Sequence, residues 1–332
     1  TRRSSDLSAD EDAWFREQGA TEVARPGKFV QFLRFLTWAN RPEASVDDAG
    51  KFVFFRDKPG TGGQLFASSG ESYVPIAPPM DVMRPFHPGR LEGLIDGWVA
   101  GDLVQANNTA VRGWVGLNGL TLIQATGSKQ PTFYSTGSAH TINGHPVVYF
   151  DGTSDCLSCQ NSEAANWGNY ETLCVIAVVR PIPVASTEGA LFCSADDGGA
   201  NTWFWLGVDA TAGNKFVLHQ RNSGDTEDVL TGPVVTSGAV QVVEWTSDGA
   251  AWQHRVKHAD QALTVTSGAN NGDALADTVG RDNVTMGARK LGGNESRNWK
   301  GDVAMMLVLT HITQDERAKL FSWISANFAT GL

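Results

Sequence analysis

The chain has 332 residues, of which 41% are hydrophobic and 36 are glycine, enough for one large or two ordinary domains of loop-rich β architecture. Its net charge is −10, its pI is near 5.1 and no Lys/Arg stripe is present, which argues against a nucleic-acid partner, because such affinity comes chiefly from clustered cations. No run approaches the roughly 20 apolar residues that cross a bilayer, so we expect no membrane insertion.

Residues 1–90 differ in sequence pattern from the rest of the chain. Ser8 and Glu11 form a capping box that predicts a short helix, and 51–56 reads as a strand, while the remainder is rich in Gly and Pro turns. The segment has too many aromatic residues to be disordered, and turn residues interrupt it too often for it to form a large hydrophobic core. We therefore predict a small irregular docking region, held by neighbouring subunits through the aromatic residues Trp14, Phe15, Phe29, Phe32 and Phe35.

From Leu94 onward, strand patterns recur about every ten residues with turn residues between them, which is typical of a two-sheet antiparallel sandwich. The predicted strands are 119–125, 145–151, 171–180, 188–194, 202–209, 215–221, 239–246, 250–258, 282–288 and 299–309. Residues 171–180 and 302–309 are apolar on both faces, so we expect other protein to cover both. Apolar and polar side chains alternate along residues 250–258, so one face of this strand should be exposed to solvent. We assign His254 and His258 to the surface by default.

The sequence closes with a predicted amphipathic helix. Thr313 and Glu316 have the spacing of a capping box. An apolar stripe follows at helical spacing, which indicates that the helix packs on a sheet; it consists of Ala318, Leu320, Phe321, Trp323 and Ile324.

The four cysteines lie at 156, 159, 174 and 193. Cys174 and Cys193 fall in apolar strand patterns and read as small buried hydrophobic residues. Cys156 and Cys159 have the spacing of a metal knuckle, but a second such pair is missing. A zinc site and a disulfide among the four remain open alternatives.

No catalytic constellation emerges. Glycosidases need two carboxylates facing the same sugar bond, and the nearest approach is Glu244 followed by Asp248, which falls in a turn and not on the strand of Glu244. The nucleophile elbow, the zinc-protease helix motif and the phosphate-binding loop are all missing from the sequence. We therefore predict that the protein is not an enzyme and that it needs no cofactor.

Calcium is the one metal that the loops suggest. Asp196 and Asp197 lie in a Gly-rich acidic loop whose ligand types and spacing suit Ca²⁺. Acidic turns are common in β proteins, so a plain solvated turn is the competing interpretation.

Aromatic residues supply the best argument for a ligand. Trp203 and Trp205 share one face of a strand, and the next ribbon offers Lys215, His219 and Arg221 on one side. Flat rings pack on the C–H faces of sugars while polar side chains bind the hydroxyls, so Trp203, Trp205, His219 and Arg221 are the predicted carbohydrate site. In the competing interpretation, which the two apolar faces of the strand favour, Trp203 and Trp205 are core and Phe204, Leu206 and Val208 face a second packed layer.

An ordered set of short motifs resembles a known family. Gly144-His-Pro-Val-Val-Tyr-Phe-Asp-Gly152, Asp155-Cys-Leu157, Met286-Gly-Ala-Arg289 and Trp299-x-Gly301-Asp-Val-Ala, with a closing helix, look like the laminin G-like branch of the concanavalin A-like jelly rolls. The Trp98-Val-Ala-Gly-Asp-Leu103 and Gln130-Pro-Thr-Phe133 segments are similar to its opening. The resemblance implies a jelly-roll sandwich over 91–332, a fold that hosts lectins, adhesins, hydrolases and structural modules alike.

Jelly rolls resembling this one recur on bacteriophage virions, which leads to a first functional hypothesis. We expect a non-enzymatic structural protein of a phage tail, fibre or capsid, located in the virion. It would be a homo-oligomer bound to other virion proteins through residues 1–90, with the sandwich touching a host surface glycan. The alternatives are an extracellular lectin or adhesin and, third, a polysaccharide-degrading enzyme.

Overall fold

The computed structural model describes the backbone of four short strands between residues 32 and 75 and, from 86 to 328, all residues except 161–166, 199–201, 223–226, 273, 277 and 279. Contacts divide the chain into two compact units, Thr1–Pro85 and Phe86–Leu332. Among the described residues, no helix is long and apolar enough to span a membrane.

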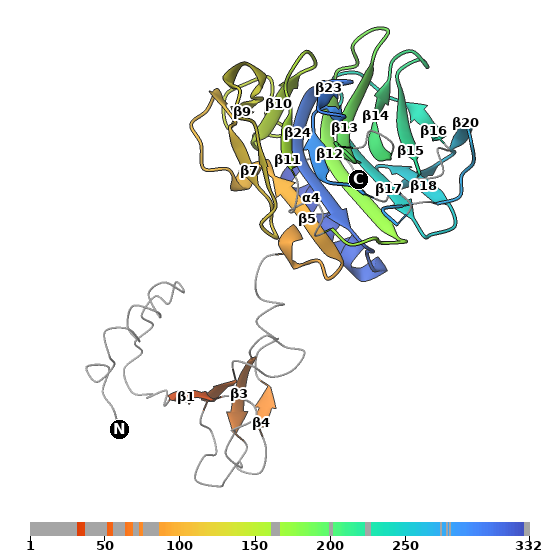
Figure 1. Cartoon of the computed structure of the whole chain (residues 1–332). Coiled ribbons are helices and arrows are strands. Elements are labelled where there is room, and N and C mark those ends of the chain that lie inside the picture. Colours follow the sequence, from red (N-terminus) through yellow and green to blue (C-terminus); the bar gives the residue numbers. More distant parts are fainter. Residues whose placement is uncertain are drawn as a thin grey trace. The chain divides into compact units, whose positions relative to one another are not determined.

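The first unit contains a four-stranded sheet in chain order (Figure 1). Its strands are β1 (Phe32–Leu36), β2 (Phe52–Phe55), β3 (Gln64–Ser68) and β4 (Tyr73–Pro75). The strand predicted at 51–56 is thus confirmed. The predicted docking residues Trp14, Phe15 and Phe29 lie outside the described residues, as do the side chains of Phe32 and Phe35, so docking stays a prediction.

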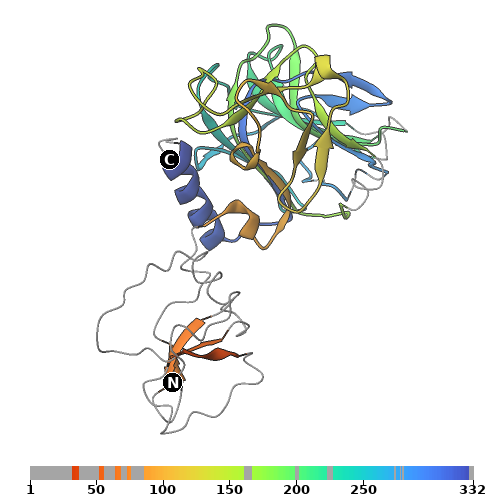
Figure 2. The ribbon, with the colours of Figure 1, turned by 90° about the vertical axis from the view of Figure 1, so that its left-hand side faces the viewer.

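The second unit is a two-sheet antiparallel jelly-roll sandwich with one C-terminal helix, as predicted (Figure 1). The helix, α4 (Gln314–Phe328), lies along the outside of one sheet (Figure 2). We call that sheet the helix-side sheet. Its strand order is β19 (Ala259–Gln261), β18 (Trp252–Val256), β17 (Gln241–Ser247), β12 (Leu173–Pro181), β24 (Lys300–Leu309), β10 (Val147–Asp151), β9 (Thr132–Tyr134) and β6 (Thr109–Ala110), with β5 (Leu94–Val99) also paired to β24.

We call the other sheet the hairpin-side sheet, because a short hairpin of β22 (Arg289–Leu291) and β23 (Asn294–Ser296) packs against it. Its strand order is β20 (Thr264–Ser267), β16 (Glu227–Val234), β15 (Lys215–Arg221), β14 (Trp203–Asp209), β13 (Glu188–Ala195), β21 (Asn283–Met286), β11 (Leu157–Gln160), β8 (Thr121–Ile123) and β7 (Gly113–Val115). Three short 3₁₀ turns, Pro88–Arg90, Ala100–Asp102 and Gly127–Lys129, connect the remaining segments.

The long strand β24 is an inner strand, as its two apolar faces predicted. Its first half pairs with β10, its second half with β5, and its other edge with β12. Val303, Met306 and Val308 face the core between the sheets, whereas Met305 and Leu307 lie under α4. Gly301, the second residue of this strand, has a φ of +141°, and a Cβ there would collide with the carbonyl of Arg180 on β12, which explains the glycine of its motif.

The closing helix confirms the capping box. The Oγ1 atom of Thr313 accepts from the amide of Glu316 at 3.3 Å, and the Glu316 carboxylate accepts from the amide of Thr313 at 3.0 Å. Leu320, Phe321 and Ile324 are buried against the sheet, but Ala318 is exposed, so its place in the predicted stripe is wrong. The buried face instead includes Phe328, one turn beyond Ile324.

All four cysteines are buried, and no disulfide joins them. This confirms the interpretation of Cys174 and Cys193 and rules out the disulfide in this structure. Burial raises the pKa of the Cys156 and Cys193 thiols to about 12, so these thiols stay protonated at neutral pH. No cluster of three or more metal-ligating side chains occurs within the described residues, and the zinc interpretation of Cys156 and Cys159 stays a prediction.

Candidate functional site

The four residues predicted to bind carbohydrate come together on the outer face of the hairpin-side sheet. Strands β14 and β15 pair so that Trp203 lies opposite Arg221 and Trp205 opposite His219. The guanidinium of Arg221 lies 4.8 Å from the Trp203 ring centroid, and the His219 ring stacks on Trp205 at 4.3 Å. Local alternation of β14 and β15 therefore placed all four side chains correctly on one face.

The hairpin adds two arginines that sequence reasoning missed. Arg289 of β22 lies 5.6 Å from the Trp203 centroid, and Arg297, just after β23, lies 5.3 Å from that of Trp205. We call the two tryptophans with Arg221, Arg289, Arg297 and His219 the Arg–Trp layer. Arg289 belongs to one of the quoted family-like motifs, but nothing in the motif indicates that a hairpin would place its side chain over Trp203.

The two indoles are covered and not open to solvent. Trp205 is fully buried and Trp203 is 6% exposed, and they cluster with Ala190, Cys193 and Val217 outside the main core. Phe204, Leu206 and Val208 instead line the core between the sheets. Both faces of β14 are therefore packed, as the alternative interpretation required, but with the faces exchanged: Phe204 is in the core and the tryptophans are in the second layer.

Acidic side chains hold part of this layer in place. The Nδ1 and Nε2 atoms of His219 lie 3.1 Å from Glu227 and 3.5 Å from Glu188, and Glu188 also pairs with Arg297. Burial lowers the pKa of His219 despite Glu227, so the ring is neutral at pH 7. Burial likewise lowers the pKa of Arg289 and Arg297, although both stay charged at pH 7. The layer thus presents guanidinium groups braced on aromatic rings, which suit oxygen-rich ligands.

The predicted calcium ligands are engaged in other contacts. The carboxylate of Asp197 lies 3.1 Å from the Lys290 ammonium and accepts the amide of Gly293 at 2.7 Å. The amide of Asp197 in turn donates to Asp282 at 2.6 Å, so Asp197 ties the loop after β13 to the hairpin. A Ca²⁺ ion would have to displace Lys290 from Asp197. The Ca²⁺ hypothesis for Asp196 and Asp197 stays a prediction.

Glu244, the nearest candidate for a catalytic carboxylate, lies beneath α4. It is 1% exposed, and its Oε1 atom lies 2.6 Å from Arg317 of α4 and 3.3 Å from Arg255 of β18. Asp248 is in an exposed turn, where it accepts the amides of Ala250 and Ala251. These positions match the sequence prediction that the two carboxylates do not share a strand.

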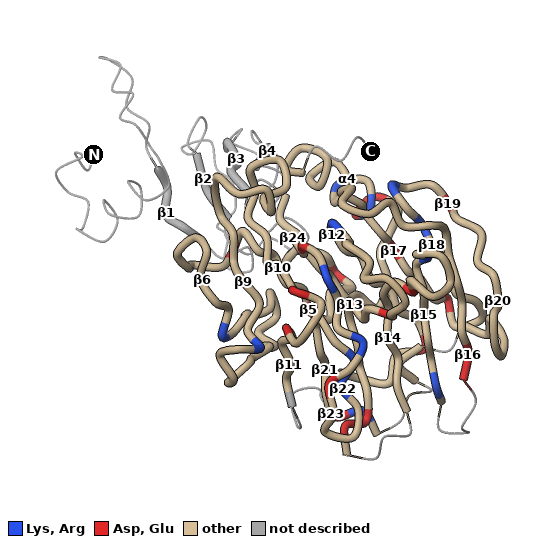
Figure 3. Tube along the Cα trace, turned by 90° about the horizontal axis from the view of Figure 1, so that it is seen from above, with Lys and Arg blue, Asp and Glu red and all other residues tan. Residues whose placement is uncertain are grey.

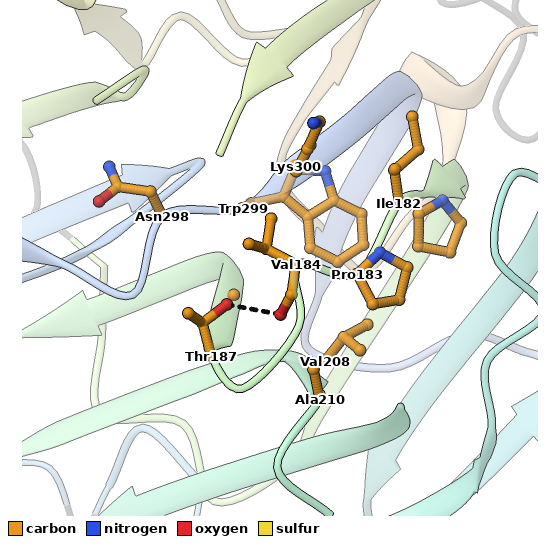
Figure 4. Close-up of a pocket in the computed structure, with 11 residues that line it drawn as sticks. Ile182, Pro183, Val184, Thr187, Val208, Ala210, Asn298, Trp299 and Lys300 are labelled. Carbon is orange, nitrogen blue, oxygen red and sulfur yellow. Dashed lines mark hydrogen bonds between the residues drawn. The ribbon is translucent and has the colours of Figure 1, made fainter. Parts of the chain in front are cut away.

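Two hollows in the described part of the molecule are small and largely apolar. One is lined by Val184, Val208 and Trp299 among others, and the Thr187 hydroxyl there donates to the Val184 carbonyl (Figure 4). The other lies between the sheets and is lined by apolar residues. No carboxylate, histidine or cysteine is among the residues that line either hollow.

No protein-family model and no curated protein matches the chain. Solved structures similar to it include the CBM40 domain of Ruminococcus gnavus IT-sialidase bound to α2,3-sialyllactose, with 17% identity over 52% of this chain and 94% of that one and a TM-score of 0.42. The NanB sialidase of Streptococcus pneumoniae gives 13% identity, 52% coverage and a TM-score of 0.42, and the match spans 27% of its length. Domain 4 of the arabinanase AbnA from Geobacillus stearothermophilus has 11% identity over 57% of this chain and 80% of that one, with a TM-score of 0.40.

Proposed function

We propose that the sandwich is a lectin-like, non-catalytic domain that binds glycans through the Arg–Trp layer. The observation that carries the proposal is the pair of guanidinium groups, of Arg221 and Arg289, over the single indole of Trp203. Glu227 lies opposite Arg221 in the neighbouring strand β16 and interacts electrostatically with Arg289, so the two cations share a polar surface beside the indole. Planar guanidinium forks bind carboxylates and vicinal hydroxyls with two parallel hydrogen bonds.

The layer favours glycans that carry a carboxylate. Around the indoles, three arginines face two nearby glutamates, Glu188 and Glu227, and these already contact His219 and Arg297. The chain as a whole carries a net charge of −10, and acidic and basic residues are interspersed over the sandwich (Figure 3). Binding of an acidic sugar would depend on the guanidinium groups of the Arg–Trp layer and weaken with salt.

An array of acidic and neutral glycans probed with the full chain tests this proposal. We expect acidic glycans to bind, and Arg289→Gln and Arg221→Gln each to weaken binding about tenfold, because each removes a charge-assisted hydrogen-bonding fork. Arg112→Gln, on an exposed arginine elsewhere, is the matched control and should leave binding unchanged. The proposal is contradicted if both layer variants bind acidic glycans as tightly as the unmodified chain, or if the unmodified chain binds no glycan.

We propose that the protein is a structural component of a phage particle. The alternative is that it is an extracellular adhesin. The separate compact unit of residues 1–85 supports a docking segment distinct from the sandwich. Light scattering of the purified full chain should then report a homo-oligomer, and cryo-microscopy of the particle should find the chain on its surface. A monomer whose residues 1–85 are cut by trace protease without effect on the sandwich would contradict the docking role.

A further inference from the structure

Far from the Arg–Trp layer, on the outer face of the helix-side sheet, a histidine ring lies between two tyrosine rings. Tyr134 of β9 stacks on His140 with centroids 4.5 Å apart and an interplanar angle of 18°, and Tyr149 of β10 lies 4.2 Å from the same ring. The two tyrosines are 6.4 Å apart. All three are half-buried, and the His140 side chain is 28% exposed, so ring surface remains open to solvent.

A buried ion pair holds this trio in position. Asp302 of β24 is 1% exposed; its Oδ1 atom lies 2.8 Å from Nδ1 of His140, and its Oδ2 atom lies 3.2 Å from Nε of Arg180. The Arg180 guanidinium also donates to three successive backbone carbonyls of the loop, at Ala139, His140 and Thr141. The loop and its ring are therefore pre-organised, which lowers the entropy lost when a ligand binds.

The polar atoms around the rings suit a neutral ligand. Asp302 is already matched by Arg180, and Asp151 uses Oδ1 to accept the amides of Thr153 and Ser154. Burial, followed by the carboxylates of Asp302, Asp151 and Asp155, raises the pKa of Tyr149, so its hydroxyl stays protonated and can donate. The same carboxylates repel an anion. Neither tyrosine hydroxyl has a hydrogen-bond partner within the described residues.

From this geometry we propose that Tyr134, His140 and Tyr149 form a second binding site, which takes the C–H face of a neutral sugar on its rings and the sugar hydroxyls on the phenolic oxygens. Partly exposed aromatic rings bordered by phenolic hydroxyls complement a pyranose ring, which has an apolar face and a polar rim. The Nε2 atom of His140, opposite the nitrogen that Asp302 holds, adds a further polar contact. The domain would then bind through both sheets, with an acidic glycan on one and a neutral glycan on the other.

Calorimetric titration of the full chain with neutral gluco-, galacto-, manno- and N-acetylglucosamine oligosaccharides tests the second site. We expect at least one series to bind, with Tyr134→Leu and Tyr149→Leu each weakening it about tenfold through loss of ring stacking. Tyr149→Phe, which removes only the hydroxyl, should weaken it about fivefold. The matched control is Tyr170→Phe, on a tyrosine packed against the main core, and Arg221→Gln should also leave neutral binding intact. Thermal unfolding of each variant shows that the fold is kept.

Three outcomes would overturn the second site and leave the Arg–Trp layer untouched. They are the failure of every neutral series to bind the unmodified chain, binding that survives in the Tyr134→Leu and Tyr149→Leu variants, and neutral binding that Arg221→Gln abolishes while the tyrosine variants keep it. The last result would assign the neutral sugar to the hairpin-side sheet. Conversely, neutral binding lost only in the tyrosine variants supports the second site even if acidic glycans fail to bind.

Discussion

His254 occupies the core between the two sheets, where sequence reasoning had assigned it to the surface. It is 1% exposed, its ring lies 4.0 Å from Trp245 and 5.3 Å from Phe216, and Nδ1 lies 3.0 Å from the carbonyl of Glu244. The alternation of β18 was correctly predicted, and His254 is on its buried side with Trp252. The surface default was wrong because a neutral imidazole with one hydrogen bond can be buried at moderate cost.

This burial predicts acid sensitivity. Desolvation lowers the pKa of His254 from 6.5 to about 3, so between these values the unfolded chain binds more protons than the folded one. The free energy of unfolding should therefore fall as pH drops from 6.5 toward 3, with His254 contributing up to about 4 kcal/mol of the loss. His254→Phe should flatten this dependence in urea unfolding measured at a series of pH values, since Phe keeps the packing. The exposed His311→Gln is the control, and an unchanged pH slope in His254→Phe would refute the assignment.

At the scale of one element, the attachment of α4 combines an apolar stripe with a buried charge. Besides Leu320, Phe321 and Ile324, the helix contributes Arg317, which contacts Glu244 at 2.6 Å within the helix-side sheet. Thr246 donates to the same carboxylate oxygen at 3.1 Å. Removing one partner of a buried ion pair leaves the other charge unpaired and is strongly destabilising. Glu244 is therefore a structural residue in the described contacts.

We predict that Glu244→Gln lowers the free energy of unfolding by about 3 kcal/mol, because two arginines lose their shared counter-charge. Asp248→Asn, in the exposed turn of the same hairpin, should change it by less than about 0.5 kcal/mol. Urea unfolding of both variants measures the difference. If both variants unfold at the same urea concentration as the unmodified chain, the ion pair does not anchor α4.

At the scale of the molecule, the sandwich carries its own core. The buried apolar clusters of the sandwich consist of residues between 91 and 328. A fragment of residues 86–332 should therefore fold by itself and keep the unfolding midpoint of the sandwich within the full chain. Circular dichroism during heating provides the measurement. A fragment that is insoluble, or that melts with little cooperativity, would show that residues 1–85 complete the fold.

The sequence by itself determined where strands lie and which have two apolar faces, because side-chain alternation of period two and turn residues are local properties. The strands at 215–221 and 299–309, the capping box at Thr313 and the shared face of Trp203, Trp205, His219 and Arg221 follow from such local patterns. The orientation of β14 does not follow from such a pattern. Because both of its faces are apolar, alternation places Phe204 and Trp203 on opposite faces but does not say which face meets the other sheet.

Only the tertiary structure decided that orientation and the make-up of both proposed sites. Arg289 reaches Trp203 from a hairpin more than eighty residues away, and His140 meets Asp302 across two strands. Contacts between residues so distant along the chain depend on strand order and on how a hairpin or loop folds over a sheet. Local periodicity carries no information about either, so it did not show that arginines cover the tryptophans.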